Sequence, residues 1–407
     1  MKKRIKDICS FVSRGASPTY VDNGSCKVMN QATFSKGFID ESNLRYSTKD
    51  SIKAKIRKGD LLMASTGGGI LGKVCYFDKE DDNFYADSHV TIMRDSKGHN
   101  LMKFLYYAFS IKYDEINATL VKGSTNQTEL QRNYLLSYEI DMPSLENQKR
   151  IVSFLDSKLS KIEKTVSLLS QKRDAYLRLK KSIIDKAVTR GLDENVKLKD
   201  SGVEWMGEIP ENWFVYRLKD ISQLTPRYTK NVVEQDVSFV PMEGLRNGSI
   251  TSQTIAFNEA YKKYTYFSEG DILVAKVTPC FENGNIAIAK DLLNKVGFGS
   301  SEIFVLRTNK KVLNTFLFFV IQSSKFKNMA CSTMCGVGGL KRISPLFMRI
   351  SEISLPPIDE QLKIVSYLET ILLKIDSTVT NLETQIEKYN QLRKSLIDEV
   401  ITGKRKV

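Results

Sequence analysis

The chain has 407 residues, and its 61 Lys and Arg against 47 Asp and Glu give a formal net charge of +14. This length predicts two or three domains that each bury a core, and a hydrophobic fraction of 42% argues against wholesale disorder. No apolar run approaches the ~20 residues of a membrane helix, no signal-peptide core follows the N-terminus, and six Cys show no framework spacing. We therefore expect a cytoplasmic protein that makes no membrane contact. Its charge favours nucleic acid as a partner, although many soluble proteins are this basic.

The first 143 residues show the pattern of an α+β domain. Short β-like runs such as 60–64 and 72–77 are bounded by Gly, Asn, Asp and Ser. A helical stretch through Leu101, Leu105 and Ala108 interrupts them. Met142-Pro143 then ends the domain, and a long helix is expected over residues 144–190.

The Gly-rich segment 67–73 matches a phosphate-binding loop in all but its last position, where Val74 replaces the Mg²⁺-binding Ser or Thr. The residues that follow predict a strand, whereas nucleotide binding needs a helix N-terminus there. We therefore favour a turn between strands, whose backbone amides, flanked by Thr66 and Lys73, could hold DNA phosphate. The pair Cys331 and Cys335 lacks further zinc ligands, and no S-adenosylmethionine loop is found. The sequence thus predicts no catalytic residue, no metal site and no cofactor in this chain.

The expected helix over 144–190 carries apolar residues in a 4-3 alternation, which indicates a coiled coil rather than an ordinary amphipathic helix on its own domain. The seam runs through Leu155, Leu159, Ile162, Val166, Leu169, Arg173, Tyr176, Lys180, Ile183 and Ala187. Its two cations are a device that can fix the register of the pairing. The residues from 145 to 190 hold 12 basic and five acidic side chains, half of the chain's net charge. That charge fits either a solvated face or a track for DNA phosphates.

After a linker over 191–213, the whole pattern repeats at an offset close to 213 residues. Arg4-Ile-Lys-Asp-Ile8 returns as Arg217-Leu-Lys-Asp-Ile221, and the helix start at 142–155 returns at 355–368. Residues 214–356 form the second domain, and 357–407 the second helix, whose seam contains Arg393. The predicted fold is α+β, with two tandem globular domains, each followed by a long helix, and the two helices paired as an antiparallel coiled coil.

Three pairs of loops occupy matched positions in the two copies but differ in sequence, as two readers of different DNA half-sites would. They are 65–73 with 276–285, 123–128 with 336–342, and 29–31 with 242–244. Asn, Gln, Lys and Arg pair with base edges, and Ser, Thr and Lys bind phosphates, although each loop alone could be a plain polar turn. The candidate DNA-binding residues are Asn30, Gln31, Ser65, Thr66, Gly68, Lys73, Ser124, Thr125, Asn126 and Gln127 in the first copy, and Lys276, Thr278, Asn283, Asn285, Lys341 and Arg342 in the second.

The duplicated unit, the helix starts at 142–155 and 355–368, and the segment Ser201-Gly-Val-Glu-Trp-Met-Gly-Glu-Ile-Pro-Glu-Asn-Trp213 resemble the specificity (S) subunit of type I restriction–modification systems. The resemblance implies two target recognition domains that read a bipartite, asymmetric sequence in double-stranded DNA. It also implies conserved helices that measure the gap and bind methyltransferase (M) and restriction (R) subunits. S-adenosylmethionine, ATP and Mg would belong to those partners. A coiled-coil scaffold and a nucleotide-binding protein, neither with sequence-specific DNA recognition, are the alternatives.

Overall fold

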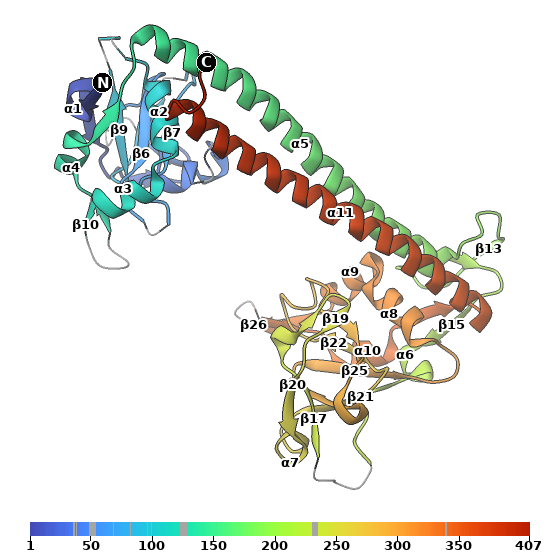
Figure 1. Ribbon diagram of the computed structural model, residues 1–407. Helices are drawn as coiled ribbons and strands as arrows, with labels where there is room; N and C mark the ends of the chain where they lie inside the picture. Colours follow the sequence, from blue (N-terminus) through green and yellow to red (C-terminus); the bar gives the residue numbers. More distant parts are fainter. Residues whose placement is uncertain are drawn as a thin grey trace. The chain divides into compact units, whose positions relative to one another are not determined.

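The computed structural model describes all residues except 36, 38, 49–53, 68, 82, 96, 99, 123–127, 230–234 and 338–339. The chain divides into two compact units (Figure 1). Unit 1 comprises Met1–Ser170 with Thr384–Val407, and unit 2 comprises Gln171–Glu383. In the described ranges, no helix is both long and apolar enough to cross a membrane.

Unit 1 is built on two four-stranded sheets. The first, antiparallel throughout, has the order β2 (Phe11–Arg14), β9 (Val90–Arg94), β6 (Leu61–Ala64), β7 (Val74–Tyr76). The second has the order β3 (Tyr20–Val21), β5 (Arg45–Ser47), β4 (Cys26–Met29), β8 (Phe84–Ala86), with β4 and β8 parallel. Around them lie α1 (Ile5–Ile8), α2 (Met102–Ser110), α3 (Tyr113–Thr119), α4 (Arg132–Ser137), η1 (Gln31–Phe34), η2 (Glu41–Asn43), the pair β1 (Lys2–Arg4) and β12 (Glu139–Asp141), and the hairpin β10 (Val121–Lys122) and β11 (Glu129–Leu130).

The strand β6 is buried on both faces. Its successive side chains point to opposite sides of the sheet, so they pack against two different layers. Leu61 and Met63 pack with the helices, including Phe104 and Leu105 of α2. Leu62 and Ala64 pack on the other side, in a cluster that includes Phe84 of the second sheet. The first sheet therefore lies between the helices and the second sheet.

Unit 2 repeats this architecture. Its first sheet has the order β16 (Ser222–Leu224), β25 (Ile303–Thr308), β22 (Ile272–Ala275), β23 (Ile286–Ile288), and its second the order β20 (Gln253–Ala256), β17 (Asp236–Val240), β24 (Val296–Gly299), β21 (Thr265–Ser268). The parallel pair is now β17 and β24. The other elements are α6 (Leu218–Ile221), α7 (Phe257–Tyr261), α8 (Asn314–Gln322), α9 (Ser324–Ser332), α10 (Pro345–Ile350), η4 (Met242–Gly244), η5 (Leu293–Lys295), and the strand pairs β13 (Leu198–Asp200) with β14 (Glu208–Pro210), β15 (Phe214–Arg217) with β28 (Glu352–Leu355), β18 (Leu245–Arg246) with β19 (Ser249–Ile250), and β26 (Cys335–Val337) with β27 (Leu340–Arg342).

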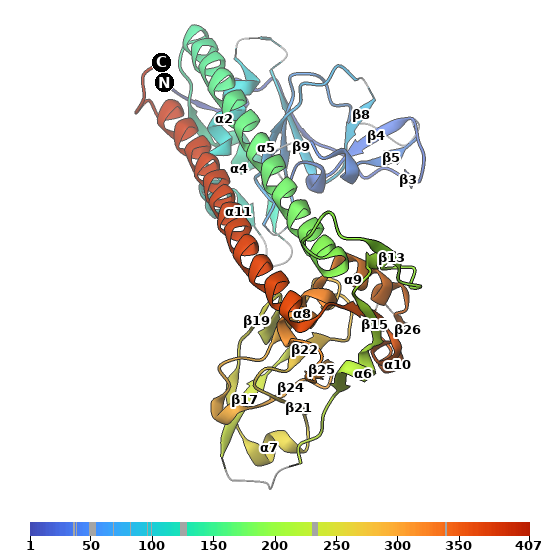
Figure 2. The same ribbon diagram turned by 90° about the vertical axis from the view of Figure 1, so that its right-hand side faces the viewer.

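The long helices are α5 (Leu145–Arg190) and α11 (Ile358–Ile401), which run side by side (Figure 2). In unit 1 the early part of α5 packs against the end of α11, through Leu155, Leu159 and Ile162 with Leu396, Ile397 and Val400. In unit 2 the end of α5 packs against the early part of α11, through Ile184, Ala187 and Val188 with Leu368, Leu372 and Ile375. These pairings confirm the predicted antiparallel coiled coil.

Cations at the seam form ion pairs between the two helices at equivalent places in the repeat. Lys180 lies 2.5 Å from Asp376 in unit 2, and Arg393 lies 3.5 Å from Glu163 in unit 1. Both the cations and the carboxylates are related by the 213-residue offset. Arg173, the third predicted seam cation, instead bonds the neighbouring Asp174 at 2.8 Å. The two cross-helix pairs join the helices in the observed register of the antiparallel pairing.

A buried glutamine joins each long helix to its domain. Gln148 is 1% exposed, and its amide accepts from the Leu101 N–H and donates to the Pro143 carbonyl, both at 2.9 Å. Gln361 is fully buried and accepts from the Leu313 N–H at 2.9 Å. Because Leu101 and Leu313 precede α2 and α8, each glutamine holds a domain helix against the start of a long helix. This explains the Gln in both repeated helix starts.

Residues 191–213, expected as a linker, fold as part of unit 2. The segment forms the β13–β14 hairpin, and its Trp213 is fully buried against Phe316 of α8. The Trp213 indole N–H donates to the Glu360 carboxylate in the first turn of α11 at 3.0 Å. The apolar residues at the end of the segment thus fasten the end of α5 to the start of α11, which composition alone did not predict.

Candidate nucleic-acid interface

Three segments of unit 1 meet at one edge of the first sheet, which we call edge 1: the turn after β6, the turn before β9, and the β10–β11 hairpin. The Ser65 N–H donates to the His89 carbonyl at 2.8 Å, and the Leu130 N–H donates to the Ser65 carbonyl at 2.9 Å. Thr66 and Glu129 form an isolated β-bridge. The predicted loop 65–73 therefore lies beside Glu129 and Leu130, which follow the predicted loop 123–128 in the sequence.

The side chains of edge 1 form polar pairs across these segments. Thr66 Oγ1 lies 2.6 Å from His89 Nδ1, and Arg14 on β2 forms an ion pair with Glu129 on β11. Gln31, from the third predicted loop, lies beside Gly67, where an added Cβ would lie 3.7 Å from Gln31 Nε2. Within the described residues its Oε1 is buried and has no partner. Edge 1 therefore brings Gln31 and Thr66 together and leaves one amide oxygen unused.

The sequence prediction missed Arg14, Asp87 and His89. The Asp87 carboxylate accepts from the His89 N–H at 2.8 Å and from the Tyr20 hydroxyl at 3.2 Å, and burial raises its pKa above the usual range. It thereby orders the turn that carries His89. The repeat could have indicated this turn, because His89 and Glu129 correspond to Glu302 and Arg342 at the same 213-residue offset.

Other predicted residues of the first copy have roles within the domain. Ser65 is 1% exposed and its hydroxyl lies 2.6 Å from that of Thr91. Asn30 caps η1 by accepting from the Ala32 N–H at 2.8 Å, and Lys73 donates to the Ser35 carbonyl at 2.7 Å. Each of the three side chains thus has a hydrogen bond within the domain, and its contact with DNA stays a prediction.

The remaining predicted residues of the first copy are Gly68, Ser124, Thr125, Asn126 and Gln127, which lie outside the described residues. The strand β7 starts at Val74, directly after Lys73, as expected for a turn between strands. The Gly-rich segment therefore lacks the helix N-terminus that nucleotide phosphates require.

Unit 2 brings the same three segments together at edge 2: the turn after β22, the turn before β25, and the β26–β27 hairpin. The Lys276 N–H donates to the Glu302 carbonyl, and the Ile343 N–H to the Lys276 carbonyl, both at 2.9 Å. Val277 and Arg342 form the bridge that corresponds to Thr66 and Glu129. The Thr278 hydroxyl accepts from the Lys341 N–H at 2.9 Å.

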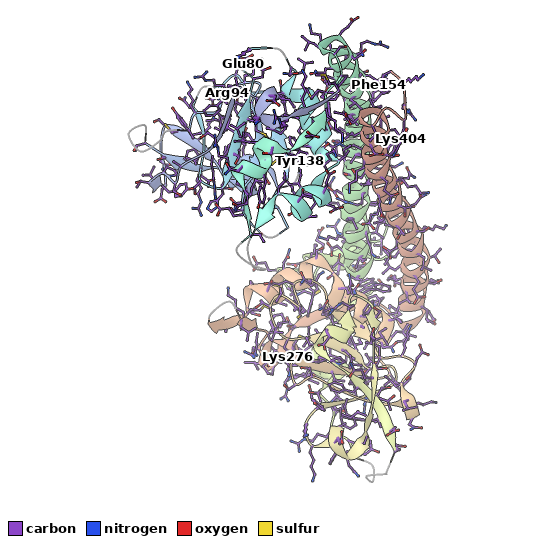
Figure 3. The ribbon with its side chains drawn as sticks, turned by 60° about the vertical axis from the view of Figure 1, so that its left-hand side comes forward. Glu80, Arg94, Tyr138, Phe154, Lys276 and Lys404 are labelled. Atoms are coloured by element: carbon purple, nitrogen blue, oxygen red, sulfur yellow. The ribbon has the colours of Figure 1, made fainter. Side chains whose placement is uncertain are left out.

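The side chains of edge 2 differ from those of edge 1. Arg342 forms two hydrogen bonds to Glu302, at 3.0 and 2.9 Å, and this pairing raises the pKa of Arg342 and lowers that of Glu302. Lys276, labelled in Figure 3, donates to the Ser301 carbonyl at 2.7 Å and lies over the Phe304 ring. Burial lowers the pKa of Lys276.

The other predicted residues of edge 2 range from exposed to buried. Lys341 and Asn283 are exposed, whereas Asn285 is 8% and Thr278 9% exposed. The accessible cationic groups of edge 2 are thus Lys341 and the partly exposed Arg342. Since Glu129 of edge 1 corresponds to Arg342, the two edges present opposite charges at equivalent backbone positions.

These observations define a class of protein: two α+β domains of one architecture, each with a loop edge of its own side chains, carried on paired antiparallel helices. In the described part of the chain, no group of three or more His, Cys, Asp or Glu side chains could hold a metal ion. Contact of any predicted residue with DNA stays a prediction.

The chain belongs to the family of the type I restriction modification DNA specificity domain, whose model matches residues 1–171 and 210–388. It is 33% identical over 194 residues to the EcoEI specificity subunit of Escherichia coli, covering 47% of this chain and 33% of that relative. It is 25% identical to a putative specificity subunit, MjaX, of Methanocaldococcus jannaschii, over 100% of this chain and 93% of the relative. The chain spans about a third of the length of the first two relatives that it matches.

The fold is also found in solved structures. A chain from a type I R-M system structure has a TM-score of 0.71 at 14% identity, covering 98% of this chain and 97% of its own. The HsdS subunit of Thermoanaerobacter tengcongensis has a TM-score of 0.51 at 15% identity, covering 99% and 96%. The likeness at these identities supports the fold, including the duplication and the paired helices.

Proposed function

We propose that this chain is the DNA specificity subunit of a type I restriction–modification complex. Its two domains would each read one half of a bipartite, asymmetric sequence in double-stranded DNA. The observation that carries the proposal is the repeated edge: the same three segments meet in both units, on matched backbones, with different side chains. Two half-sites of different sequence require such a pair of sites, with the same backbone arrangement and different side chains.

The chemistry of the edges supports direct reading of bases. Gln31 can donate from its amide nitrogen to a base edge, and Arg342 can pair with a guanine through its guanidinium. Arg342 is bound to Glu302 in the free chain, so the carboxylate fixes the orientation of the guanidinium at the cost of competing with DNA. Thr66 and Lys341 fit contacts to phosphate or to base edges.

We further propose that methyltransferase and restriction subunits bind this chain and bring the catalysis with them. S-adenosylmethionine, ATP and Mg would be bound by those partners, and this chain would have a non-catalytic recognition role. Exposed apolar side chains on α11 support a protein partner there: Leu362 is 52%, Leu373 71% and Leu392 51% exposed. The paired helices would also set the gap between the half-sites.

The test uses the chain assembled with its partner methyltransferase and maps the methylated DNA sequences. Arg342→Gln should relax one base pair of one half-site, by ~1–3 kcal/mol of discrimination, and Gln31→Ala should relax one position of the other half. Lys363→Ala, at an exposed site on α11, is the control and should leave both halves unchanged. Relaxation of both halves by one substitution, or of neither by any, would contradict the proposal.

A further inference from the structure

A cleft of about 520 Å³ between α5 and α9 of unit 2 gathers more positive charge than its neighbours can neutralise. Its lining includes Arg178, Lys181, Lys186 and Arg190 on α5 and Lys325 on α9, against one carboxylate, Asp185. The four α5 cations lie between residues 178 and 190, over about 18 Å of helix.

Several of these cations are available to a ligand. Lys186 is paired with Glu194 and Arg190 with Glu208, and Asp185 accepts from the Ser324 N–H at 2.6 Å. Arg178, Lys181 and Lys325, by contrast, have no ion-pair partner in the portion of the chain that the structure describes. A concave site with three uncompensated cations attracts an anion.

A fourth cation connects the cleft to edge 2. Burial and the charge of Lys181 lower the pKa of Lys327 on α9, while Asp185 and Cys331 act in the opposite direction. A Cβ added to Gly284 would lie 3.6 Å from Lys327 Nζ. Gly284 follows Asn283 in the candidate reading turn after β22. The positive charge therefore runs from α5 through α9 to the loop that is expected to contact bases.

The first copy carries less of this charge. On the long helices, Arg178, Lys186 and Arg190 correspond to Gln391, Glu399 and Gly403, and Lys181 corresponds to Lys394. On the domain side, Lys325 corresponds to Lys112 and Lys327 to Asp114. The glycine of the reading turn is Gly284 in the second copy and Gly72 in the first. A Cβ added at Gly284 would contact Lys327, whereas one added at Gly72 would contact the buried Ile116. Because the two copies share one backbone fold but differ in charged residues at these positions, the basic cleft is a specific feature of unit 2 rather than a consequence of the fold.

We propose that the α5–α9 cleft binds DNA backbone phosphates next to the half-site read by unit 2, through Arg178, Lys181, Lys325 and Lys327. This inference rests on the proposed function. DNA is favoured over an acidic protein segment because the charge continues into the base-reading turn. Duplex DNA carries one charge per ~1.7 Å, so a length of duplex equal to about 18 Å of cationic helix carries about ten phosphates over both strands. The cleft would add affinity without sequence preference and make binding by the two units unequal.

The test measures binding of the full chain to a mixed-sequence duplex of about 40 base pairs over a range of KCl concentrations. The triple variant Arg178→Gln, Lys181→Gln, Lys327→Gln should flatten the plot of log affinity against log salt by about 2–3, since each lost phosphate contact removes about 0.9. The control removes three exposed lysines of α11, with Lys374→Gln, Lys388→Gln and Lys394→Gln, at equal loss of charge. It should change the slope by less than one.

Equal slopes for the triple variant and the control, while the unaltered chain binds DNA, would overturn the cleft and leave the specificity function standing. Failure of the unaltered chain to bind duplex at low salt would overturn both. Loss of methyltransferase assembly in the triple variant, with an unchanged salt slope, would assign the cleft to a protein partner and overturn the proposal. If the triple variant does not fold, the pair Arg178→Gln, Lys181→Gln, which leaves half-buried Lys327 intact, should flatten the slope by about 2.

Discussion

Replacement of Gln361 by leucine should destabilise unit 2 and leave unit 1 intact. The Gln361 amide accepts from the Leu313 N–H at 2.9 Å and donates to the carbonyls of Lys311 at 3.0 Å and Pro356 at 2.9 Å. Leucine has a similar volume, so little cavity forms, but three backbone groups lose their partner. At ~1–3 kcal/mol for a buried unpaired group, and less where a carbonyl keeps other contacts, we expect a loss of about 3–5 kcal/mol.

Tryptophan fluorescence reports this change from unit 2 alone, because both Trp residues of the chain, Trp205 and Trp213, lie there. In urea, a loss of about 3–5 kcal/mol corresponds to a fall of roughly 1–2 M in the midpoint for a slope of ~2–3 kcal/mol/M. Hydrogen exchange should show lost protection at the starts of α8 and α11. Lys363→Ala, two residues along the same helix and exposed, should leave both readouts unchanged.

The equivalent substitution in the first copy is a matched comparison. Gln148→Leu removes two hydrogen bonds instead of three and acts in unit 1, which contains no Trp. It should leave the fluorescence midpoint unchanged and expose the amides at the start of α2 to exchange. A fluorescence midpoint of Gln361→Leu within about 0.3 M of the unaltered chain, a shift that corresponds to less than one hydrogen bond, would contradict the anchoring role of Gln361.

Three further outcomes follow from other contacts. Reversal of one seam pair, with Glu163→Arg and Arg393→Glu together, should recover the stability that either single change loses. The coupling energy should be below ~1 kcal/mol because both side chains are partly exposed. A double-mutant cycle in urea that shows no coupling would contradict a role of this pair in the register of the helices. Glu302→Gln should release Arg342 from its ion pair and strengthen binding of the target duplex, measured by titration; an unchanged affinity would mean that Glu302 does not compete with DNA for Arg342. Insertion of seven residues in each long helix should lengthen the gap between half-sites by about three base pairs, since it adds ~10.5 Å of helix; methylated sequences with an unaltered gap would contradict the measuring role.

Long-range periodicity explains what the sequence predicted well. The repeat at one offset established the duplication, and the 4-3 spacing of apolar residues established the helix pairing, because both signals sum over many residues. The repeated Gln148 and Gln361 mark the helix starts, and the structure shows the physical reason, since each amide joins a helix start to its domain. A residue that recurs at matched positions in both copies therefore indicates a role in the fold that the two copies share.

The site was predicted less completely, because side chains that cooperate there come from separate segments. Arg14 and His89 were missed because neither stands in a polar loop pattern, and they reach edge 1 only through the pairing of β2, β9 and β6. Ser65 and Asn30 have side chains of a type that binds DNA, and in the structure the Ser65 hydroxyl and the Asn30 amide oxygen form hydrogen bonds within the domain. The segment 191–213 resembled a linker because its apolar residues, including Trp213, find their partners in distant helices.

If each domain reads its own half of the DNA target, exchanging one domain should change one half only. The experiment replaces residues 1–143 by the corresponding domain of a relative and maps the methylated sequences of the hybrid, assembled with its methyltransferase. We expect one half of the bipartite sequence to change to that of the donor, while the other half and the gap between them stay the same. A hybrid that folds and methylates DNA but changes both halves, or neither, would contradict it.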